Sequence, residues 1–458
     1  MKFLECLKSE LDLENGLPVD TSNEDGWWSW YTADGLDKNQ GEITIDIPGT
    51  DNYIDFSSCQ LYTKTKIYNE EAGFDTELTE QNCTIAPINN FLYSQFKQHT
   101  IEVNSTVVEN TINFAYKCYL LNLLNYNNEA KNTHLSACLF CSDTSSKMEI
   151  INTSSIKKET VDNKPNEFID KPQDVNEGFV KRRKILLDGK GRLEMVGPIY
   201  SDLFNSDRLM LNKTAIRIKL YKNDENFCLM GPQNHKFKFY FEEIKLRVRH
   251  QQLSSSAILA HTKLLQNSNA IYPIKDTFVK RISVKNSTLQ VDTEITKGIL
   301  PEKIIIGMTE SLSATGKVDK NPFNFQHFYP QNIKLRVNQL EKPYLNSINL
   351  DFEKNFFYNG YMTLFDAIDK HDLGISITPN DYKNGYALYA FNLLPITSCG
   401  GDYSTLLKTG VVTLEILFKE KSIEVFPKQD IDLICLLVYD SKLEIDAERK
   451  AFKQMIIV

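Results

Sequence analysis

Two blocks of sequence in the first half of the chain recur in the second half, in the same order, and this duplication limits the possible folds more than any other feature. Residues 90–104 resemble residues 321–338, and each block ends in a strand pattern followed by a short aromatic-rich helix. Residues 211–216 resemble residues 407–411, and each of these opens another alternating strand. The sequence therefore predicts two copies of one domain, with the polar residues 142–190 inserted into the first copy.

Both copies have the pattern of β-structure, because apolar residues recur at every second position. Ile43, Ile45 and Ile47 alternate with polar residues before a Pro-Gly turn, and residues 333–337 and 412–418 repeat this pattern. Residues 60–68 predict a more solvated strand, whereas the nearly all-apolar residues 431–439 predict a central strand covered on both faces. The strand order and the long connections favour two packed four-stranded sheets, a jelly roll, over a meander or an immunoglobulin sandwich.

A strand–helix–strand segment at residues 236–284 separates the two copies. In its first strand the odd-numbered positions are apolar up to Phe241, and the even-numbered positions are apolar from Ile244 onward. This change of phase predicts a β-bulge at Glu242-Glu243. Three serines beginning at Ser254 are suitable N-caps, and apolar residues at helical spacing follow, so the segment also predicts a helix that bridges the two copies.

The predicted fold class is all-β, with two tandem eight-stranded jelly rolls joined by a short helix and with short helices in loops. We expect an N-terminal arm at residues 1–40, a first jelly roll at 41–253 with a polar insertion at 142–190, a linker helix at 254–268, a second jelly roll at 269–446, and a C-terminal tail at 447–458.

The arm contains all three tryptophans of the protein, Trp27, Trp28 and Trp30, followed by Tyr31. We expect this cluster to pack on its own domain. An arm that reaches a neighbouring subunit is the alternative, because Trp and Tyr are common anchors of protein interfaces.

The insertion is rich in Ser, Thr, Asn, Lys and Asp and has little periodicity, so it predicts a long surface loop. It contains the basic run Lys181-Arg182-Arg183-Lys184. A solvated charge run is favoured over a nuclear import signal or an anion contact.

Charge and cysteine content exclude several classes. There are 52 basic and 60 acidic residues and a net charge of −8, so a broad nucleic-acid footprint is not expected. Nine scattered cysteines indicate free thiols in a reducing compartment. The first 14 residues lack the apolar core of a signal peptide, and no run approaches the length of a membrane span. The five Asn-x-Ser/Thr triplets are therefore expected to be chance.

No constellation of residues predicts catalysis, and we name no catalytic, cofactor-binding or metal-binding residue. A cupin-type metal site needs a His-x-His pair, which is missing among His99, His134, His235, His250, His261, His327 and His371. Cys138 and Cys141 form one isolated CxxC, which is a weak zinc or redox signal. Residues 188–191 (Asp-Gly-Lys-Gly) are too short for a phosphate loop and predict a turn, and His261 on the bridging helix is expected to be a packed or capping side chain.

Several separate blocks of the sequence carry a family resemblance. They are residues 196–199 (Val-Gly-Pro-Ile), 202–204 (Asp-Leu-Phe), 207–212 (Asp-Arg-x-Met-Leu-Asn), 227–230 (Phe-Cys-Leu-Met), 260–263 (Ala-His-x-Lys), 269–274 (Asn-Ala-x-Tyr-Pro-Ile), 320–325 (Lys-Asn-Pro-Phe-Asn-Phe), 384–391 (Asn-Gly-Tyr-x-Leu-Tyr-Ala-Phe) and 444–446 (Glu-Ile-Asp). In this order the blocks resemble the major capsid proteins of Maverick/Polinton elements and the related adintoviruses. The resemblance runs from about residue 9 to residue 446, is dense after residue 197 and is weakest in the insertion.

This resemblance implies a double jelly-roll major capsid protein without enzymatic activity, whose trimers are the pseudo-hexameric capsomers of an icosahedral shell. Two similar domains in each of three subunits place six similar units around one axis. The implied partners are further copies of the chain in a homotrimer and then a capsid lattice, a separate penton-type capsid protein, a packaging ATPase and a maturation protease. No cofactor, sequence-specific nucleic acid or transmembrane segment is implied. The implied location is the virion, with synthesis in the host cytoplasm and nuclear assembly left open.

Two alternatives to a capsid subunit stay open. A lectin-like jelly-roll binding module would have a concave aromatic or calcium-binding face, although the sequence has no evident Asp/Asn-rich calcium loop. A host-retained, capsid-derived protein that works outside a virion is the other alternative.

Overall fold

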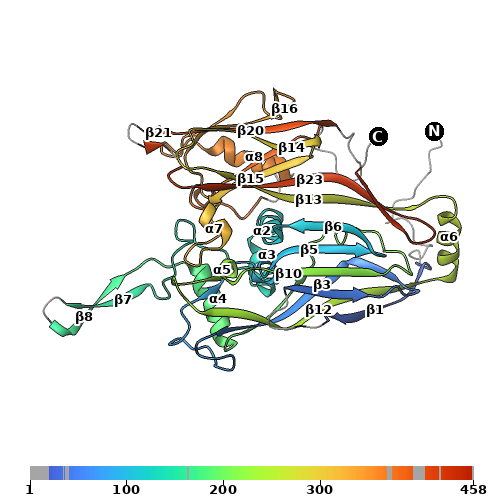
Figure 1. The fold of residues 1–458 in the computed structure, drawn as a ribbon, viewed down its shortest axis with the longest axis horizontal. Coiled ribbons are helices and arrows are strands. Elements are labelled where there is room, and N and C mark those ends of the chain that lie inside the picture. Colours follow the sequence, from blue (N-terminus) through green and yellow to red (C-terminus); the bar gives the residue numbers. More distant parts are fainter. Residues whose placement is uncertain are drawn as a thin grey trace, which may run out of the picture.

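The computed structural model describes residues 20–34, 36, 41–161, 164–368, 374–395, 408–421, 424–425 and 427–455. These residues form two jelly rolls, each made of two antiparallel sheets (Figure 1). The first roll has one sheet in the order β1 (Asn23–Thr32), β12 (Phe237–Leu253), β3 (Tyr53–Asn69) and β9 (Arg192–Pro198). Its other sheet has the order β2 (Glu42–Ile47), β10 (Ile216–Lys222), β5 (Phe96–Val103) and β6 (Thr106–Ile112).

The second roll repeats this arrangement. One sheet has the order β13 (Ala270–Val284), β23 (Ile431–Ile445), β15 (Lys303–Glu310) and β19 (Leu388–Asn392), with β24 (Ala451–Met455) also paired to β23. The other has the order β14 (Gln290–Ile299), β20 (Thr409–Phe418), β16 (Pro330–Val337) and β17 (Leu340–Glu341), with β18 (Ile348–Asn349) also on β16.

The predicted duplication is confirmed by this topology. Numbered along each roll, the main strands lie in the order 1-8-3-6 in one sheet and 2-7-4-5 in the other, in both copies. The two matched sequence blocks fall on equivalent strands, β5 with β16 and β10 with β20. The same strand order and the same placement of the matched blocks are expected if the two rolls are copies of one domain, because copies keep the same sequence of strands and connections.

Helices and short hairpins occupy the connections. The helices are α1 (Phe91–Ser94), α2 (Phe114–Asn125), α3 (Asn128–Asn132), the 3₁₀ helix η2 (His134–Cys138), α4 (Glu177–Asp188), α5 (Glu225–Cys228), α6 (Ser255–Leu265), α7 (Ser311–Thr315), α8 (Tyr358–Ile368) and α9 (Pro379–Lys383). The short ladders are β4 (Ala86–Pro87) with β11 (Leu229–Met230), β7 (Ile156–Val161) with β8 (Lys164–Pro172), and β21 (Glu420–Lys421) with β22 (Glu424–Val425).

The segment that bridges the rolls has the predicted form. The register of β12 against β3 shifts between Phe241 and Glu243, which confirms the bulge. The Ser254 side chain accepts a hydrogen bond from the Ala257 N–H, 3.4 Å away, and α6 follows as the predicted bridging helix. Only Leu265 of α6 is buried, so this helix lies on the surface at one end of the molecule (Figure 1).

Both chain ends contribute strands where the sequence suggested an arm and a tail. Residues 23–32 form β1, which pairs with β12, and residues 451–455 form β24. The Arg247 guanidinium of the same roll lies over the Trp28 ring, 4.1 Å from the ring centre. The Tyr31 hydroxyl lies 2.9 Å from His250 Nε2. The aromatic cluster of the arm therefore packs on its own domain, as the sequence analysis predicts.

Two strand predictions need correction. Residues 60–68 belong to β3, and its Thr63, Thr65 and Lys66 are buried rather than solvated, because β3 lies between β12 and β9 in its sheet. The sequence also predicts a buried strand at residues 304–306 that ends at Gly307, whereas β15 runs on to Glu310. By contrast, β23 lies between β13 and β15 with nearly all of its residues buried, as predicted for residues 431–439.

The prediction that residues 142–190 form a long surface loop is wrong, as is the prediction that residues 181–184 are a solvated charge run. The segment contains the β7–β8 hairpin, which projects from the end opposite α6, and the helix α4 (Figure 1). Within the basic run, Arg182 is fully buried and Arg183 donates to backbone carbonyls of residues 80 and 83. The buried positions Phe179, Arg182 and Leu186 recur at helical spacing, so the arginine lies on the face of α4 that packs inward.

Substitution of Gly197 tests the close packing between β9 and the helices that cover it. A Cβ at this position would lie 2.3 Å from Tyr93 Oη and 2.4 Å from Cys138 Sγ. We predict that Gly197→Ala lowers the free energy of unfolding by about 1–3 kcal/mol, because both neighbours are buried and must move. Urea denaturation measures this change. Gly41→Ala, with no atom within 4 Å of the new Cβ, is the matched control, and equal losses in both variants would contradict the packing.

Candidate functional site: the seam between the two rolls

The two rolls are joined along one continuous contact zone, which we call the seam, between residues 20–253 and residues 269–455. Figure 1 shows the four sheets as stacked layers, with the β13–β23–β15–β19 sheet facing the β2–β10–β5–β6 sheet of the first roll. Strand β6 contacts β13 and β24, and α2 contacts β13. The seam fixes how the rolls are oriented to one another.

At the α6 end, the seam is closed by hydrogen bonds to one loop of the first roll. The hydroxyl of Tyr272, at the start of β13, donates to the Leu209 carbonyl and accepts from the Leu211 N–H, each at 3.1 Å. The Arg449 guanidinium donates to the carbonyl and to the side-chain oxygen of Asn212, at 2.9 and 2.7 Å. Burial raises the pKa of Tyr272 to about 12, so this hydroxyl keeps its proton at physiological pH.

In the middle of the seam lies a buried group of charges. Lys117 Nζ, on α2, is 3.0 Å from Glu109 Oε1 and 2.9 Å from Asp202 Oδ2. His99 Nε2 is 2.9 Å from the same Glu109 oxygen. The backbone N–H of Thr277, on β13, donates to Asp202 Oδ2 at 2.9 Å. A carboxylate of the first roll therefore binds the main chain of the second.

The charges in this group are set by burial and by one another. Burial raises the pKa of Asp202 to about 7, although Lys117 acts in the other direction. Burial also raises the pKa of Glu109, but the Lys117 ammonium and His99 outweigh it and hold that pKa well below its ordinary value. Burial lowers the pKa of His99, although Glu109 acts in the other direction. One ammonium thus lies between two carboxyl groups, and Glu109 carries the negative charge more firmly than Asp202 does.

At the far end, Arg182 is the largest of the fully buried side chains. Its guanidinium donates to the carbonyls of Pro87 and Cys141, at 2.8 and 2.7 Å, and to Asp143 Oδ1 at 2.7 Å. Two separate chain segments, at residue 87 and at residues 141–143, are tied to α4 in this way. All three nitrogens of the guanidinium have partners, which is the condition under which a charge is tolerated in a protein interior.

Asp143 carries the same network across the seam. Its Oδ2 accepts from the Asn321 side-chain amide at 3.0 Å, and its backbone carbonyl accepts from the Tyr386 hydroxyl at 2.7 Å. The Asn176 side chain, which caps α4, donates to Asp143 Oδ1 at 2.9 Å. One aspartate thus holds the inserted helix, the first roll and the second roll together.

Aromatic rings fill the space beside this network. Tyr119 on α2 stacks on Phe323 of the second roll, with ring centres 4.0 Å apart and planes 4° apart. Tyr116 and Phe227 meet Phe323 edge-on, at 5.6 and 6.0 Å. Offset and edge-on ring pairs add to the energy of apolar burial, so the seam is an apolar core as well as a polar network.

Many seam residues lie in the blocks that carry the sequence resemblance. Such residues include Asp202, Leu211, Asn212, Tyr272, Asn321, Phe323 and Tyr386. Several of the blocks therefore contain residues that join the two rolls.

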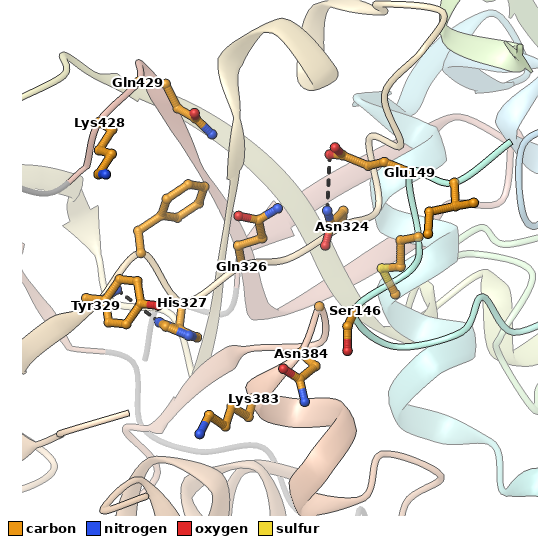
Figure 2. Close-up of a pocket in the computed structure, with 14 residues that line it drawn as sticks. Ser146, Glu149, Asn324, Gln326, His327, Tyr329, Lys383, Asn384, Lys428 and Gln429 are labelled. Carbon is orange, nitrogen blue, oxygen red and sulfur yellow. Dashed lines mark hydrogen bonds between the residues drawn. The ribbon is translucent and has the colours of Figure 1, made fainter. Parts of the chain in front are cut away.

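A polar cavity of about 520 Å³, the seam pocket, opens between the insertion and the second roll (Figure 2). Glu149 of the insertion accepts from the Asn324 amide at 3.2 Å and from Lys320 at 2.8 Å. In Figure 2, Gln326 lies beside Asn324, and the side chains of Lys383 and Asn384 lie below them. The walls carry amide, ammonium, hydroxyl and carboxylate groups beside the His327 ring, which suit a polar ligand.

His327 forms one wall of the seam pocket. Its ring stacks on Phe352, with ring centres 3.9 Å apart. Its Nδ1 accepts a hydrogen bond from the Tyr329 N–H at 3.0 Å (Figure 2). The pKa of His327 is lowered to about 4, mainly by burial and to a smaller extent by the positive charge of the nearby Lys383. The imidazole is therefore neutral at physiological pH.

A second cavity, of about 510 Å³, lies between α6 and the start of β13, and we call it the α6 groove. Its walls include Leu264 and Leu265 of α6, Ile271 and Tyr272 of β13, and Leu209 of the first roll. These walls are mainly apolar, in contrast to those of the seam pocket.

The other residues singled out in the sequence have structural roles. Cys138 is buried with Sγ 3.3 Å from the Val196 carbonyl, and Cys141 is only partly exposed. His261 Nδ1 lies 3.0 Å from the Tyr53 hydroxyl, as a packed histidine would. Residues 188–191 form the turn after α4. Within the described ranges, no three His, Cys, Asp or Glu side chains gather as metal ligands.

Sequence reasoning missed the charged residues of the seam. Arg182 could have been found, because it shares one helical face with Phe179 and Leu186. Asp143 and Asn321 could not, since their partners are far apart in the chain and follow from the tertiary fold.

No helix in the part of the chain that the structure describes is both long and apolar enough to span a bilayer.

Comparison with known proteins yields one curated relative and several solved structures. No family model matches the chain. The chain is 24% identical, over 361 residues, to the uncharacterized protein F54H12.2 of Caenorhabditis elegans, across 75% of this chain and 77% of that protein.

The similar solved structures are of viral proteins. A chain of the Sputnik virophage matches with a TM-score of 0.61 and 10% identity, over 100% of this chain and 94% of that one. A PBCV-1 virus capsid chain matches at 0.56 and 8%, over 97% and 99%. The mavirus major capsid protein matches at 0.50 and 9%, over 100% and 96%. These matches span both rolls and show that the fold is the double jelly roll.

We predict that Asp143→Ala lowers the free energy of unfolding by about 3–5 kcal/mol, because it leaves the buried Arg182 charge without its carboxylate. Urea denaturation at a fixed protein concentration measures the loss. The control is Asp46→Ala, which removes an exposed pair with Arg217 (Nε to Oδ1, 2.6 Å) and should cost about 0–1 kcal/mol. Similar losses in the two variants would contradict the role of Asp143.

The lowered pKa of His327 predicts that the free energy of unfolding depends on pH. Its pKa is depressed to about 4 in the folded protein from the ordinary 6.5, so the unfolded chain binds this proton first as the pH falls. Its contribution is complete above pH 6.5, is lost progressively as the pH falls toward 4, and amounts to about 3 kcal/mol. His327→Asn keeps an acceptor for the Tyr329 N–H but cannot titrate. The variant should lose less stability than the parent between pH 6.5 and 4, and parallel pH profiles would refute this.

Proposed function

We propose that this chain is a major capsid protein whose trimers form pseudo-hexameric capsomers of an icosahedral shell. The observation that carries the proposal is the double jelly roll itself, in which two rolls of identical topology are fixed to each other by a buried seam. It is supported by the likeness, over the whole chain, to chains of the Sputnik virophage and the PBCV-1 capsid and to the mavirus major capsid protein.

Symmetry explains why a fused pair of rolls suits a shell. Three copies of the chain around one axis present six similar rolls, and six similar units can occupy a six-coordinated position in a lattice. This works only if the angle between the two rolls is the same in every copy. A seam with buried charge pairs, hydrogen bonds and stacked rings meets that requirement, because it resists independent motion of the rolls.

The surface offers apolar side chains for contacts between copies. Trp30 on the edge strand β1 is 50% exposed. In the second roll, Phe356 is 67% exposed and lies close in sequence to the exposed Tyr358 and Met362 of α8. Exposed aromatic and large apolar side chains are common in protein interfaces. We propose that these surfaces become buried between neighbouring chains.

The relative in Caenorhabditis elegans bears on the biological source of the shell. A relative in an animal supports a genome-resident element of the Maverick/Polinton type rather than a virus without a host-integrated stage. The same observation supports the second candidate, a host-retained capsid-derived protein, which would keep the trimer but work outside a virion. If the chain belongs to a genome-resident element, its further partner is a separate penton-type capsid protein at the five-coordinated positions of the virion shell.

A subunit of this kind is a structural protein without catalytic turnover. The seam uses its carboxylates and its arginine to hold chain segments together, and each of these groups is already bound to protein partners. We therefore propose no substrate and no cofactor.

We predict that the purified protein is a trimer, with three times the 52.7 kDa of one chain, when its mass is measured by light scattering. Obligate interfaces of roughly 2,000 Å² or more should keep the trimer intact on dilution. Negative-stain images of the same fraction should show particles with a hexagonal outline. A mass of one chain at every concentration would contradict a preassembled capsomer.

A further inference from the structure

The α6 groove is an apolar surface without an occupant among the described residues. Leu264, which lines it, is 62% exposed, and the neighbouring Leu259 and Ile271 are exposed as well. The buried polar groups around it are already paired, since the Tyr53 hydroxyl meets His261 and the Tyr272 hydroxyl is bonded at the seam. What the groove lacks is an apolar partner, because apolar side chains in a concave site are stabilised by being covered.

The N-terminal end of the described chain lies beside this groove. The Ser22 carbonyl accepts a hydrogen bond from the Ser254 N–H at 2.8 Å, and Ser254 is the N-cap of α6. Leu253, next to Ser254, lines the groove. Residues 1–19 precede this point and lie outside the described ranges, so the chain enters the described part of the protein at the edge of the cavity.

Residues 1–19 have the composition that the groove requires. Phe3, Leu7 and Leu11 recur at every fourth position, the spacing of one helix face. The segment has four acidic and two basic residues, whereas Arg208 on the wall of the groove and Lys263 on α6 are basic and exposed. Apolar content and charge therefore both match the surface.

We propose that residues 1–19 dock into the α6 groove of the same chain. Attachment next to the groove gives the segment a local concentration in the millimolar range, far above that of a free partner. The segment then covers the bridging helix and the α6 end of the seam. This inference stands apart from the proposed capsid role, because docking within one chain needs no trimer.

Disulfide trapping tests the proposal, because the segment contains a native cysteine, Cys6. Leu264→Cys places a thiol in the groove. The matched control is Leu312→Cys, a similarly exposed leucine (54%) on α7, at the end of the molecule opposite α6 (Figure 1). The full-length protein is oxidised with diamide, which takes up the two hydrogens of the thiol pair, and the product is mapped by mass spectrometry.

Docking predicts a disulfide within one chain between Cys6 and position 264, in at least about tenfold higher yield than with position 312. Cys6→Ser should abolish it. Equal yields at the two positions would overturn the proposal. A disulfide between two chains would also overturn it, because the segment would then occupy the groove of a second copy.

Thiol labelling provides an independent measurement without a cross-link. With Cys6→Ser in the background, the maleimide reaction of Leu264→Cys should accelerate at least about fivefold when residues 1–19 are deleted, since the groove is then uncovered. The reaction of Leu312→Cys should not change. An unchanged rate at position 264 would show that the segment does not cover the groove. Trimer mass, measured on the same samples, reports on the capsid proposal separately.

Discussion

The buried carboxylate of Asp143 is the interaction on which the arrangement of the two rolls most depends. It binds the fully buried Arg182 of the insertion and the Asn321 amide of the second roll at the same time. A charge in the interior costs free energy unless all of its hydrogen-bonding groups have partners, and here the partners come from both rolls. The arrangement of the rolls therefore decides whether the buried charge has all of its hydrogen-bond partners. At a different angle between the rolls, the Asp143 carboxylate would lose the Asn321 amide and remain buried without this partner.

The seam repeats this principle along its length. Asp202, which lies beside Lys117, accepts a hydrogen bond from a backbone N–H of β13. In the other direction, the Tyr272 hydroxyl of the second roll donates a hydrogen bond to a carbonyl of the first roll. Stacked rings fill the remaining space, so polar contacts set the geometry and apolar contacts add energy. Two domains joined only by a linker would instead move relative to one another, because small polar interfaces between domains permit such motion. The proposed capsid role requires that the two rolls keep one fixed arrangement.

Much of the fold could be predicted from the sequence because its signals are local or repeated. Alternation located most strands, the phase change at Glu242-Glu243 located the bulge, and two repeated blocks revealed the duplication that the sheet order confirms. The seam could not be predicted in the same way. The pairing of Asp143 with Asn321 brings together residues on different rolls, and no local pattern specifies it. Composition also misled, because a polar, basic insertion proved to contain a packed helix with Arg182 on its inner face.

The central claim is that one chain supplies two equivalent rolls to a sixfold-like unit. Cryo-electron microscopy of the purified assembly tests it most directly. The account predicts a particle with threefold symmetry in which six jelly rolls alternate around the axis, three from each half of the chain, with the seam inside each subunit. A reconstruction in which the rolls of one chain are separated, or in which the oligomer has no threefold axis, would contradict it.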